Sequence, residues 1–179
     1  MKDILLNFGL PEEFAKHSKA LDLNKVEVAE PSKKTWEQYL YGVYDNILLT
    51  GRNGSGKTYT GCAIIVAAIM RQFLSYRVTF NNVIRQYTEN DWEMPDKFTQ
   101  PAYLFVDEVG KEVQKDLGQN VLEELVRTRL ESKHKRTLLA TNMNPAAFFQ
   151  KYGPTIKSDI KGHYALVVMP DVDRRAKNG

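Results

Sequence analysis

The fold of this chain of 179 residues is decided by residues 46–58, which read NILLTGRNGSGKT. Residues 46–50 are mostly apolar and predict a buried strand, and residues 51–58 have the spacing G-x-x-x-x-G-K-T of a phosphate-binding loop. The apolar run at residues 62–70 predicts that a helix beginning near Thr58 follows the loop. Because strand, loop and helix occur in the order that phosphate binding requires, the sequence predicts an α/β fold with a nucleotide site.

Each residue type in the loop has a role in holding phosphate. The three glycines permit positive φ and let backbone N–H groups approach phosphate oxygens, and the following helix adds the positive end of its dipole. Lys57 is expected to reach the β- and γ-phosphates, and the Thr58 hydroxyl is expected to bind Mg²⁺. The expected residues of this nucleoside triphosphate site are Gly51, Arg52, Asn53, Gly54, Ser55, Gly56, Lys57, Thr58 and Tyr59.

A second apolar run, residues 103–106, leads into two carboxylates, Asp107 and Glu108. This is the form of a Walker B segment, in which a central strand delivers acids to its carboxyl end. We expect Asp107 to hold Mg²⁺ together with Thr58, through bound water. Glu108 is expected to orient and polarise the water that attacks the γ-phosphate, as a general base. The alternative, an acidic turn after a core strand, is disfavoured by the phosphate loop upstream.

Asn142 follows a further strand-like run, residues 137–141. If that strand lies beside the Walker B strand, the Asn142 amide can hydrogen-bond the γ-phosphate or the attacking water. The alternative is an ordinary strand end that precedes a helix cap. Lys57, Glu108 and Asn142 are therefore the candidate catalytic residues.

Composition limits the class of protein. Hydrophobic residues make up 42% and charged residues 26% of the chain, as in globular proteins, and the length suits one domain. The first fourteen residues carry three acids around a short apolar patch, so we expect no secretory signal, a cytoplasmic location and no membrane partner. Cys62, the single cysteine, lies in the apolar helix and is expected to be buried.

Strand-like and helix-like segments alternate from residue 46 onward. Strands are predicted at residues 47–50, 77–80, 103–107, 137–141 and 164–169, and the helical patterns between most of them predict a parallel sheet covered on both faces. Upstream, helices are predicted at residues 12–21 and 35–41. We therefore divide the chain into a short helical N-terminal segment, residues 1–44, and a nucleotide-binding domain, residues 45–179.

The motifs NILLTGRNGSGKTYTGCAI, YLFVDEVG and RTLLATNM make the chain resemble the AAA+ ATPases, and within them the bacterial and phage replicative helicase loaders (DnaC/IstB-like) and transposition helper ATPases. The resemblance implies a P-loop NTPase three-layer sandwich with strand order 5-1-4-3-2, without a full C-terminal helical lid. It also implies that the nucleotide is ATP. By matching positions, Lys57 and Thr58 belong to Walker A, Asp107 and Glu108 to Walker B, and Asn142 to sensor 1.

The chain departs from the family pattern where an arginine finger is usual. In place of Ser-Arg-Leu it has Ser158-Asp159-Ile160, and the neighbouring cations, Lys157 and Lys161, lack the planar fork of arginine. Loss of a finger can slow hydrolysis by ~10³-fold or more, so we expect an ATPase that is slow or stimulated by a partner. Near the end of the chain, Arg174 or Arg175 is a candidate sensor of nucleotide.

The resemblance implies a helicase loader that binds and hydrolyses ATP, assembles on single-stranded DNA as an ATP-dependent homo-oligomer and recruits a hexameric replicative DNA helicase. Two alternatives remain: a transposition helper ATPase that acts on a transposase, and a nucleotide-switched binding module with negligible hydrolysis.

Two segments are candidate DNA contacts. The first is a basic cluster after a helix, which a solvated helix end would account for equally well: Arg127, Arg129, Lys133, His134, Lys135 and Arg136. The second is residues 81–99, where Arg85, Tyr87 and Trp92 resemble a stacking platform for single strands. Four acids in the same segment repel phosphate, so a loop that covers the core is an equal alternative.

Overall fold

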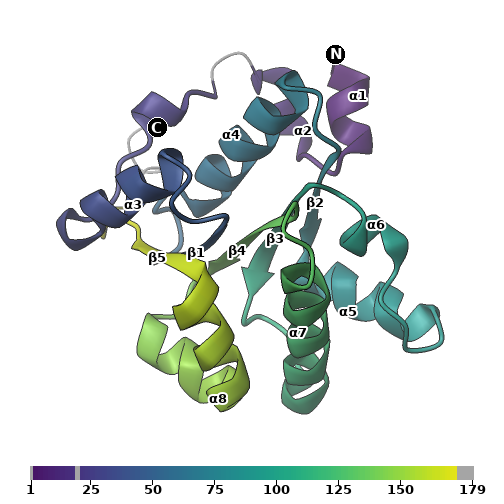
Figure 1. Ribbon diagram of the computed structural model, residues 1–179. Helices are drawn as coiled ribbons and strands as arrows, with labels where there is room; N and C mark the ends of the chain where they lie inside the picture. The colour runs from purple at the N-terminus through teal and green to yellow at the C-terminus, as the bar shows by residue number, and fades with distance from the viewer. Residues whose placement is uncertain (1, 19–20, 173–179) are drawn as a thin grey trace.

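Strand β1 (Asn46–Thr50) is buried along its whole length and lies inside a five-stranded sheet. The computed structural model describes residues 2–18 and 21–172 and is shown in Figure 1. The other strands are β2 (Ser75–Thr79), β3 (Tyr103–Val109), β4 (Arg136–Thr141) and β5 (Tyr164–Val168). All pairings are parallel and the order is β2-β3-β4-β1-β5, which confirms the expected order 5-1-4-3-2.

Helices cover both faces of the sheet, because successive strand residues point to opposite sides. Ile47 and Leu49 of β1 enter one core cluster, and Leu48 enters the other. The first cluster lies under α1 (Lys2–Asn7), α2 (Glu12–Lys16), α3 (Lys33–Leu40) and α4 (Lys57–Met70). The second lies under α5 (Phe80–Glu89), α7 (Lys115–Leu130) and α8 (Pro145–His163). The short helix α6 (Asp96–Thr99) precedes β3, and two 3₁₀ turns, η2 (Leu23–Lys25) and η3 (Glu30–Ser32), precede α3.

Two of the boundaries that differ from the sequence expectation have a clear physical cause. Phe80, expected at the end of a strand, begins α5, and its aromatic side chain is fully buried in the second core cluster. The helix expected over residues 12–21 ends at Lys16, and the His17 ring caps it through a contact between Nδ1 and the Glu13 carbonyl at 2.9 Å. Tertiary packing and a local cap therefore override the apolar pattern.

The N-terminal residues meet both edges of the sheet. The Arg77 N–H in edge strand β2 donates to the Phe8 carbonyl at 2.8 Å. At the opposite edge the Ala29 N–H donates to the Val168 carbonyl at 2.9 Å, and the Ser32 hydroxyl accepts from the Val168 N–H at 2.9 Å. These contacts satisfy edge groups that a sheet otherwise leaves open. Leu5, Ala15 and Trp36 share the first core cluster with β1 and α4, so the N-terminal segment and the sheet have one core.

Among the described residues no helix is both long and apolar enough to cross a membrane.

We predict that the Cys62 thiol is inert in the folded protein. Its side chain is fully buried in α4, and this burial raises the pKa of the thiol to about 12, so the thiolate is scarce at pH 8. A thiol-reactive probe at pH 8 is expected to label the native protein at least ~100-fold more slowly than protein unfolded in denaturant. Equal labelling rates would contradict the packing of α4 on the sheet.

Candidate functional site

The loop between β1 and α4 has the backbone that its glycines permit. Gly51, Gly54 and Gly56 have φ of 147°, 78° and 100°, and Gly56 is the N-cap of α4. A Cβ atom on Gly51 would come within 3.0 Å of both Met169 Cβ and Ser55 Oγ. The loop therefore needs glycine for conformation and for space, and it leads into the N-terminus of a helix of 14 residues, a favourable place for an anion.

The Lys57 side chain bridges its own loop. Its ammonium donates to the carbonyls of Gly51 and Arg52 at 2.6 Å each and contacts Ser55 Oγ at 3.4 Å, and the residue is buried. These partners are backbone and hydroxyl oxygens with only partial charge. A phosphate oxygen in the loop would be the stronger partner for this ammonium, because charge-assisted hydrogen bonds are roughly twice as strong as neutral ones.

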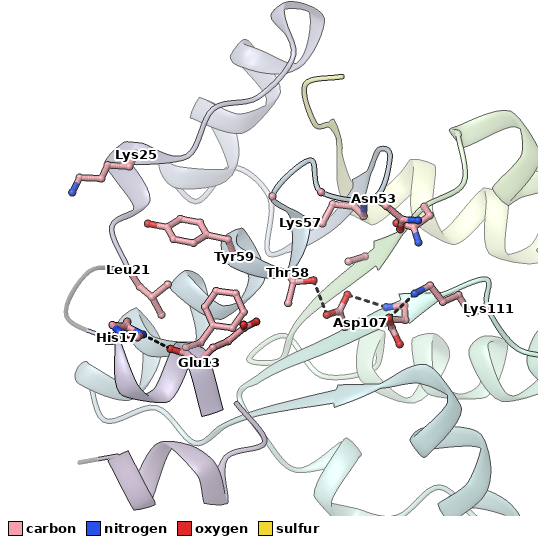
Figure 2. Close-up of a pocket in the computed structure, with 16 residues that line it drawn as sticks. Glu13, His17, Leu21, Lys25, Asn53, Lys57, Thr58, Tyr59, Asp107 and Lys111 are labelled. Carbon is pink, nitrogen blue, oxygen red and sulfur yellow. Dashed lines mark hydrogen bonds and ion pairs between the residues drawn. The ribbon is translucent and has the colours of Figure 1, made fainter. Parts of the chain in front are cut away.

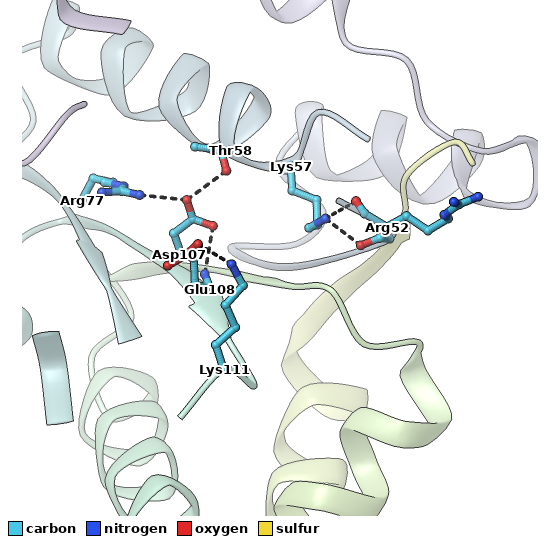
Figure 3. A network of polar contacts seen from close by, with 8 residues as sticks. Arg52, Lys57, Thr58, Arg77, Asp107, Glu108 and Lys111 are labelled. Carbon is cyan, nitrogen blue, oxygen red and sulfur yellow. Dashed lines mark hydrogen bonds and ion pairs between the residues drawn. The ribbon is translucent and has the colours of Figure 1, made fainter. Parts of the chain in front are cut away.

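Asp107 joins three elements of the fold (Figure 3). Its Oδ2 accepts a hydrogen bond from Thr58 Oγ1 at the start of α4 at 3.0 Å, and another from Arg77 Nη2 in β2 at 2.9 Å. Its Oδ1 accepts from the Glu108 N–H at 2.9 Å. The structure thus brings together Thr58 and Asp107, the two residues predicted to hold a metal. Their oxygen atoms are the hard ligands that Mg²⁺ prefers, so this pair suits the ion.

Glu108 stands in a strained conformation at the carboxyl end of β3. Its φ of 63° is left-handed, and the pairing of β3 with β4 shifts register between Val106 and Val109. Such a conformation costs ~1–3 kcal/mol in a residue with a side chain and is found at functional sites. The Glu108 carboxylate forms an ion pair with Lys111 at 2.6 Å, and both side chains are partly exposed. The distortion places the backbone so that Glu108 borders the cavity beside Asp107.

A cavity of about 820 Å³ connects these groups (Figure 2). This volume lies within the range of ~300–1,000 Å³ that small-molecule sites occupy. Lys57, Thr58, Asp107, Glu108 and Asn142 all border it, so separate stretches of sequence meet there. Asn142 follows β4, which lies between β1 and β3, and its side chain is exposed to the cavity.

The other loop residues are divided between the cavity and its surroundings. Asn53, Gly54, Gly56 and Tyr59 border the cavity. Ser55, also in the loop, is fully buried. Arg52 turns outward and forms an exposed ion pair with Asp171 at 2.9 Å.

Residues of the N-terminal segment form a wall of the cavity that the motifs do not reveal. Phe14 lies edge-on to the Tyr59 ring, with centroids 6.4 Å apart, and the Tyr59 hydroxyl accepts from the Asp22 N–H at 3.1 Å. The remaining members of this wall are Glu13, His17, Leu21 and Lys25. The cavity consequently has a polar end at the loop and carboxylates and a partly apolar end at Phe14, Leu21 and Tyr59. Only the fold brings these residues of the N-terminal segment close to α4, so no sequence signal marks them.

Sequence reasoning also missed Arg77 and Lys111. Arg77 pairs with Phe105 in the register of β2 and β3, two residues before the level of Asp107, so a long side chain can reach that carboxylate. The available signal was an arginine in the predicted strand that precedes the Walker B strand along the chain. Lys111 lies three residues after Glu108, and acid–lysine pairs at this spacing are too common on protein surfaces to mark a site.

The candidate DNA contacts are only partly on the surface, and the expectation for Arg129 is wrong. Arg129 is 1% exposed, and burial lowers the pKa of its guanidinium to about 10. The group donates to Thr137 Oγ1 at 2.8 Å and to three carbonyls at 2.9–3.1 Å, those of Phe98, Pro101 and Arg136. It is a structural arginine that satisfies the carbonyls at the start of β3 and β4.

The second DNA candidate, residues 81–99, forms α5, α6 and the turn between them. The Tyr87 hydroxyl donates to Glu124 at 2.7 Å, whereas Trp92 is 60% exposed and lies edge-on to Tyr87. Asp159 lies within α8, and Lys157 and Lys161 are exposed on the same helix and do not border the cavity. Arg174 and Arg175 lie outside the described residues.

Solved structures of DNA replication proteins share this fold. A DNA replication initiation factor is 19% identical with a TM-score of 0.68, and the match covers 88% of this chain and 51% of that one. The replication initiator DnaA bound to AMPPCP and single-stranded DNA is 19% identical with a TM-score of 0.67, covering 84% and 50%. The DnaC helicase loader is 14% identical with a TM-score of 0.67, covering 84% and 97%.

This chain spans about half the length of the two initiator structures that it matches. No protein-family model matches the chain, and no curated protein matches it. At these identities the likeness concerns the fold. The shared fold is, in this chain, a five-stranded parallel sheet of order β2-β3-β4-β1-β5 with helices on both faces.

Proposed function

We propose that this chain binds ATP with Mg²⁺ in the cavity at the carboxyl end of the sheet and hydrolyses it slowly. The observation that carries the proposal is the convergence of Lys57, Thr58, Asp107, Glu108 and Asn142 on one cavity. The glycine-rich loop and the start of α4 suit the phosphates, and the partly apolar end at Phe14 and Tyr59 suits the base.

In this proposal each group has a separate task. The Lys57 ammonium gives up its hydrogen bonds to the loop carbonyls and binds the β- and γ-phosphates. Thr58 with Asp107 holds Mg²⁺. Glu108 orients the attacking water, after its ion pair with Lys111 opens. Asn142 donates a hydrogen bond to the γ-phosphate or to that water.

The proposed role of this ATPase is in replication initiation, as a cytoplasmic helicase loader. The support is the fold shared with the DnaC helicase loader over nearly the whole of that chain, and with DnaA bound to AMPPCP and single-stranded DNA. In the proposal, residues 45–179 form the ATP-binding domain and residues 1–44 a short partner-binding segment. ATP drives self-assembly on single-stranded DNA and recruitment of a hexameric replicative helicase.

A nucleotide-switched binding module with negligible hydrolysis is the second candidate. Two observations favour it: Glu108 is paired with Lys111, and Asp159 stands where an arginine finger is usual. Hydrolysis assays with and without partner distinguish it from the loader.

We predict that Lys57→Ala weakens ATP binding by at least ~100-fold, because it removes the ammonium from the phosphate loop. The measurement is titration of a fluorescent ATP analogue in the presence of Mg²⁺. Lys34→Ala, which removes an exposed lysine from α3, is the matched control and should bind as the unaltered chain does. Unchanged binding by Lys57→Ala would place the nucleotide elsewhere.

Glu108→Gln is expected to leave ATP binding within a few-fold and to lower hydrolysis by ~100-fold or more, since the amide cannot accept a proton. Release of phosphate is followed for the protein alone and with single-stranded DNA. Glu131→Gln, an exposed position after α7, is the control. If Glu108→Gln hydrolysed ATP at the rate of the unaltered chain, another group would be the base.

The loader role predicts ATP-dependent capture of the replicative helicase encoded by the same genome. The full chain is immobilised and exposed to that helicase with ATP and Mg²⁺, with ADP, or without nucleotide. The helicase is expected to be retained only in the condition with ATP and Mg²⁺, and Lys57→Ala is expected to abolish this retention. Retention that does not depend on nucleotide, or no retention of the helicase, would contradict the role while leaving the ATP site intact.

A further inference from the structure

The Asp107 carboxylate is buried, and Arg77 supplies a cation to it. The two side chains are 5% and 15% exposed, and Arg77 Nη2 lies 2.9 Å from Asp107 Oδ2. This is the same oxygen that accepts the hydrogen bond from Thr58, and the other oxygen accepts from the Glu108 N–H. A buried carboxylate stays ionised at low cost only where a positive charge and hydrogen bonds compensate for lost water.

The nearby lysines are engaged with other groups. Lys57 donates to the carbonyls of its own loop, and Lys111 pairs with Glu108. Arg77 comes from a different element, the edge strand β2, and reaches Asp107 from the side of β3 away from β4.

The N-terminal segment holds the backbone of Arg77 from both sides of its peptide. The Arg77 N–H donates to the Phe8 carbonyl at 2.8 Å. Gly9, with φ of 80°, lies so close that a Cβ atom there would come 1.9 Å from the Arg77 carbonyl oxygen. The position of the guanidinium is therefore restricted by backbone contacts as well as by its ion pair.

The guanidinium reaches Asp107 at a cost to its own hydrogen bonding. Arg77 Nε is buried, and it has no hydrogen-bond partner among the described residues. An arginine placed for its own solvation would satisfy this donor, because unpaired buried donors are unfavourable. The unmet donor indicates that the attraction of the Asp107 charge dominates the placement of this side chain.

We propose that Arg77 is an internal cation that compensates the Asp107 carboxylate and keeps it hydrogen-bonded to Thr58 without a divalent ion, so that nucleotide binding depends only weakly on Mg²⁺. The inference rests on the proposed ATP site and assigns Arg77 as a positioning residue of that site. Its charge substitutes in part for that of Mg²⁺ at Asp107 when no nucleotide is bound. Removal of Arg77 should therefore lower the stability of the ligand-free protein, and Mg²⁺ should then raise that stability.

The first test uses Mg²⁺ alone and the full chain without nucleotide. Arg77→Met should lower the melting temperature by about 5 °C or more, because it leaves a buried carboxylate without its cation. Addition of Mg²⁺ at millimolar concentration should recover much of that loss, while the unaltered chain shifts little. Arg77→Lys should retain part of the stability, and Arg71→Met, an exposed arginine after α4, should behave as the unaltered chain.

Asp107→Asn completes a double-mutant cycle. In that background Arg77→Met should lower the melting temperature little, and Mg²⁺ should not raise it. The reason is that the negative charge that Arg77 or Mg²⁺ would neutralise is absent. Additive losses, or an equal Mg²⁺ shift in every variant, would overturn the proposal. If Arg77→Met does not fold without Mg²⁺, two results still test the proposal. Mg²⁺ should allow Arg77→Met to fold, and Arg77→Lys should retain part of the stability.

The second test compares nucleotide affinity in Mg²⁺ and in EDTA with the fluorescent ATP analogue. The unaltered chain should lose less than ~10-fold in EDTA, and Arg77→Met should lose ~10-fold more than that, a difference of about 1.4 kcal/mol. The same Mg²⁺ dependence in both proteins would refute the role of Arg77. Failure of the unaltered chain to bind in either condition would refute the ATP site instead, and the unfolding cycle would still decide whether Arg77 compensates Asp107.

Discussion

The Asp107 carboxylate is the group on which the organisation of this molecule depends. It lies buried near the carboxyl end of β3, and its hydrogen bonds reach the start of α4 through Thr58 and the edge strand β2 through Arg77. A charge at this depth is stable only when its partners are fixed, since an unpaired buried carboxylate is costly. The same bonds that compensate the charge therefore hold the phosphate loop, the central strand and the edge strand in one arrangement.

Around this group the protein accepts unfavourable geometry where chemistry requires it. Glu108 adopts a left-handed conformation within β3, and Arg77 keeps a buried donor unsatisfied. Such departures are retained only when surrounding packing determines them, and here both lie within one residue or one hydrogen bond of Asp107. Gln72, Asp91 and Trp92 also have positive φ, but they lie in turns that do not border the cavity.

The N-terminal segment connects the edges of the sheet to the site. It pairs with β2 at Phe8 and with β5 at Ala29, and five of its described residues form a wall of the cavity: Glu13, Phe14, His17, Leu21 and Lys25. A ligand that contacts Phe14 would therefore touch the segment that also holds the backbone of Arg77. A partner that binds the described part of this segment would meet a surface next to the cavity.

Much of the fold could be predicted from the sequence, because its signals are local. The apolar runs ending in Thr50, Asp107 and Thr141 require buried parallel strands, and the loop glycines require positive φ, whatever surrounds them. The strand order came from resemblance to a family and not from periodicity, and the structure confirms it. The start of α5 at Phe80 and the burial of Arg129 depend on distant residues and contradicted the local pattern.

The sequence by itself determined that phosphate-binding and acidic groups would meet at one edge of a parallel sheet, because motif spacing and strand direction suffice for that. Only the tertiary structure decided which cation compensates Asp107, that Lys111 pairs with Glu108, and that described residues of the N-terminal segment line the cavity. The physical reason is that these contacts join side chains from separate elements. Their energies depend on burial and distance, which the order of residues along the chain does not specify.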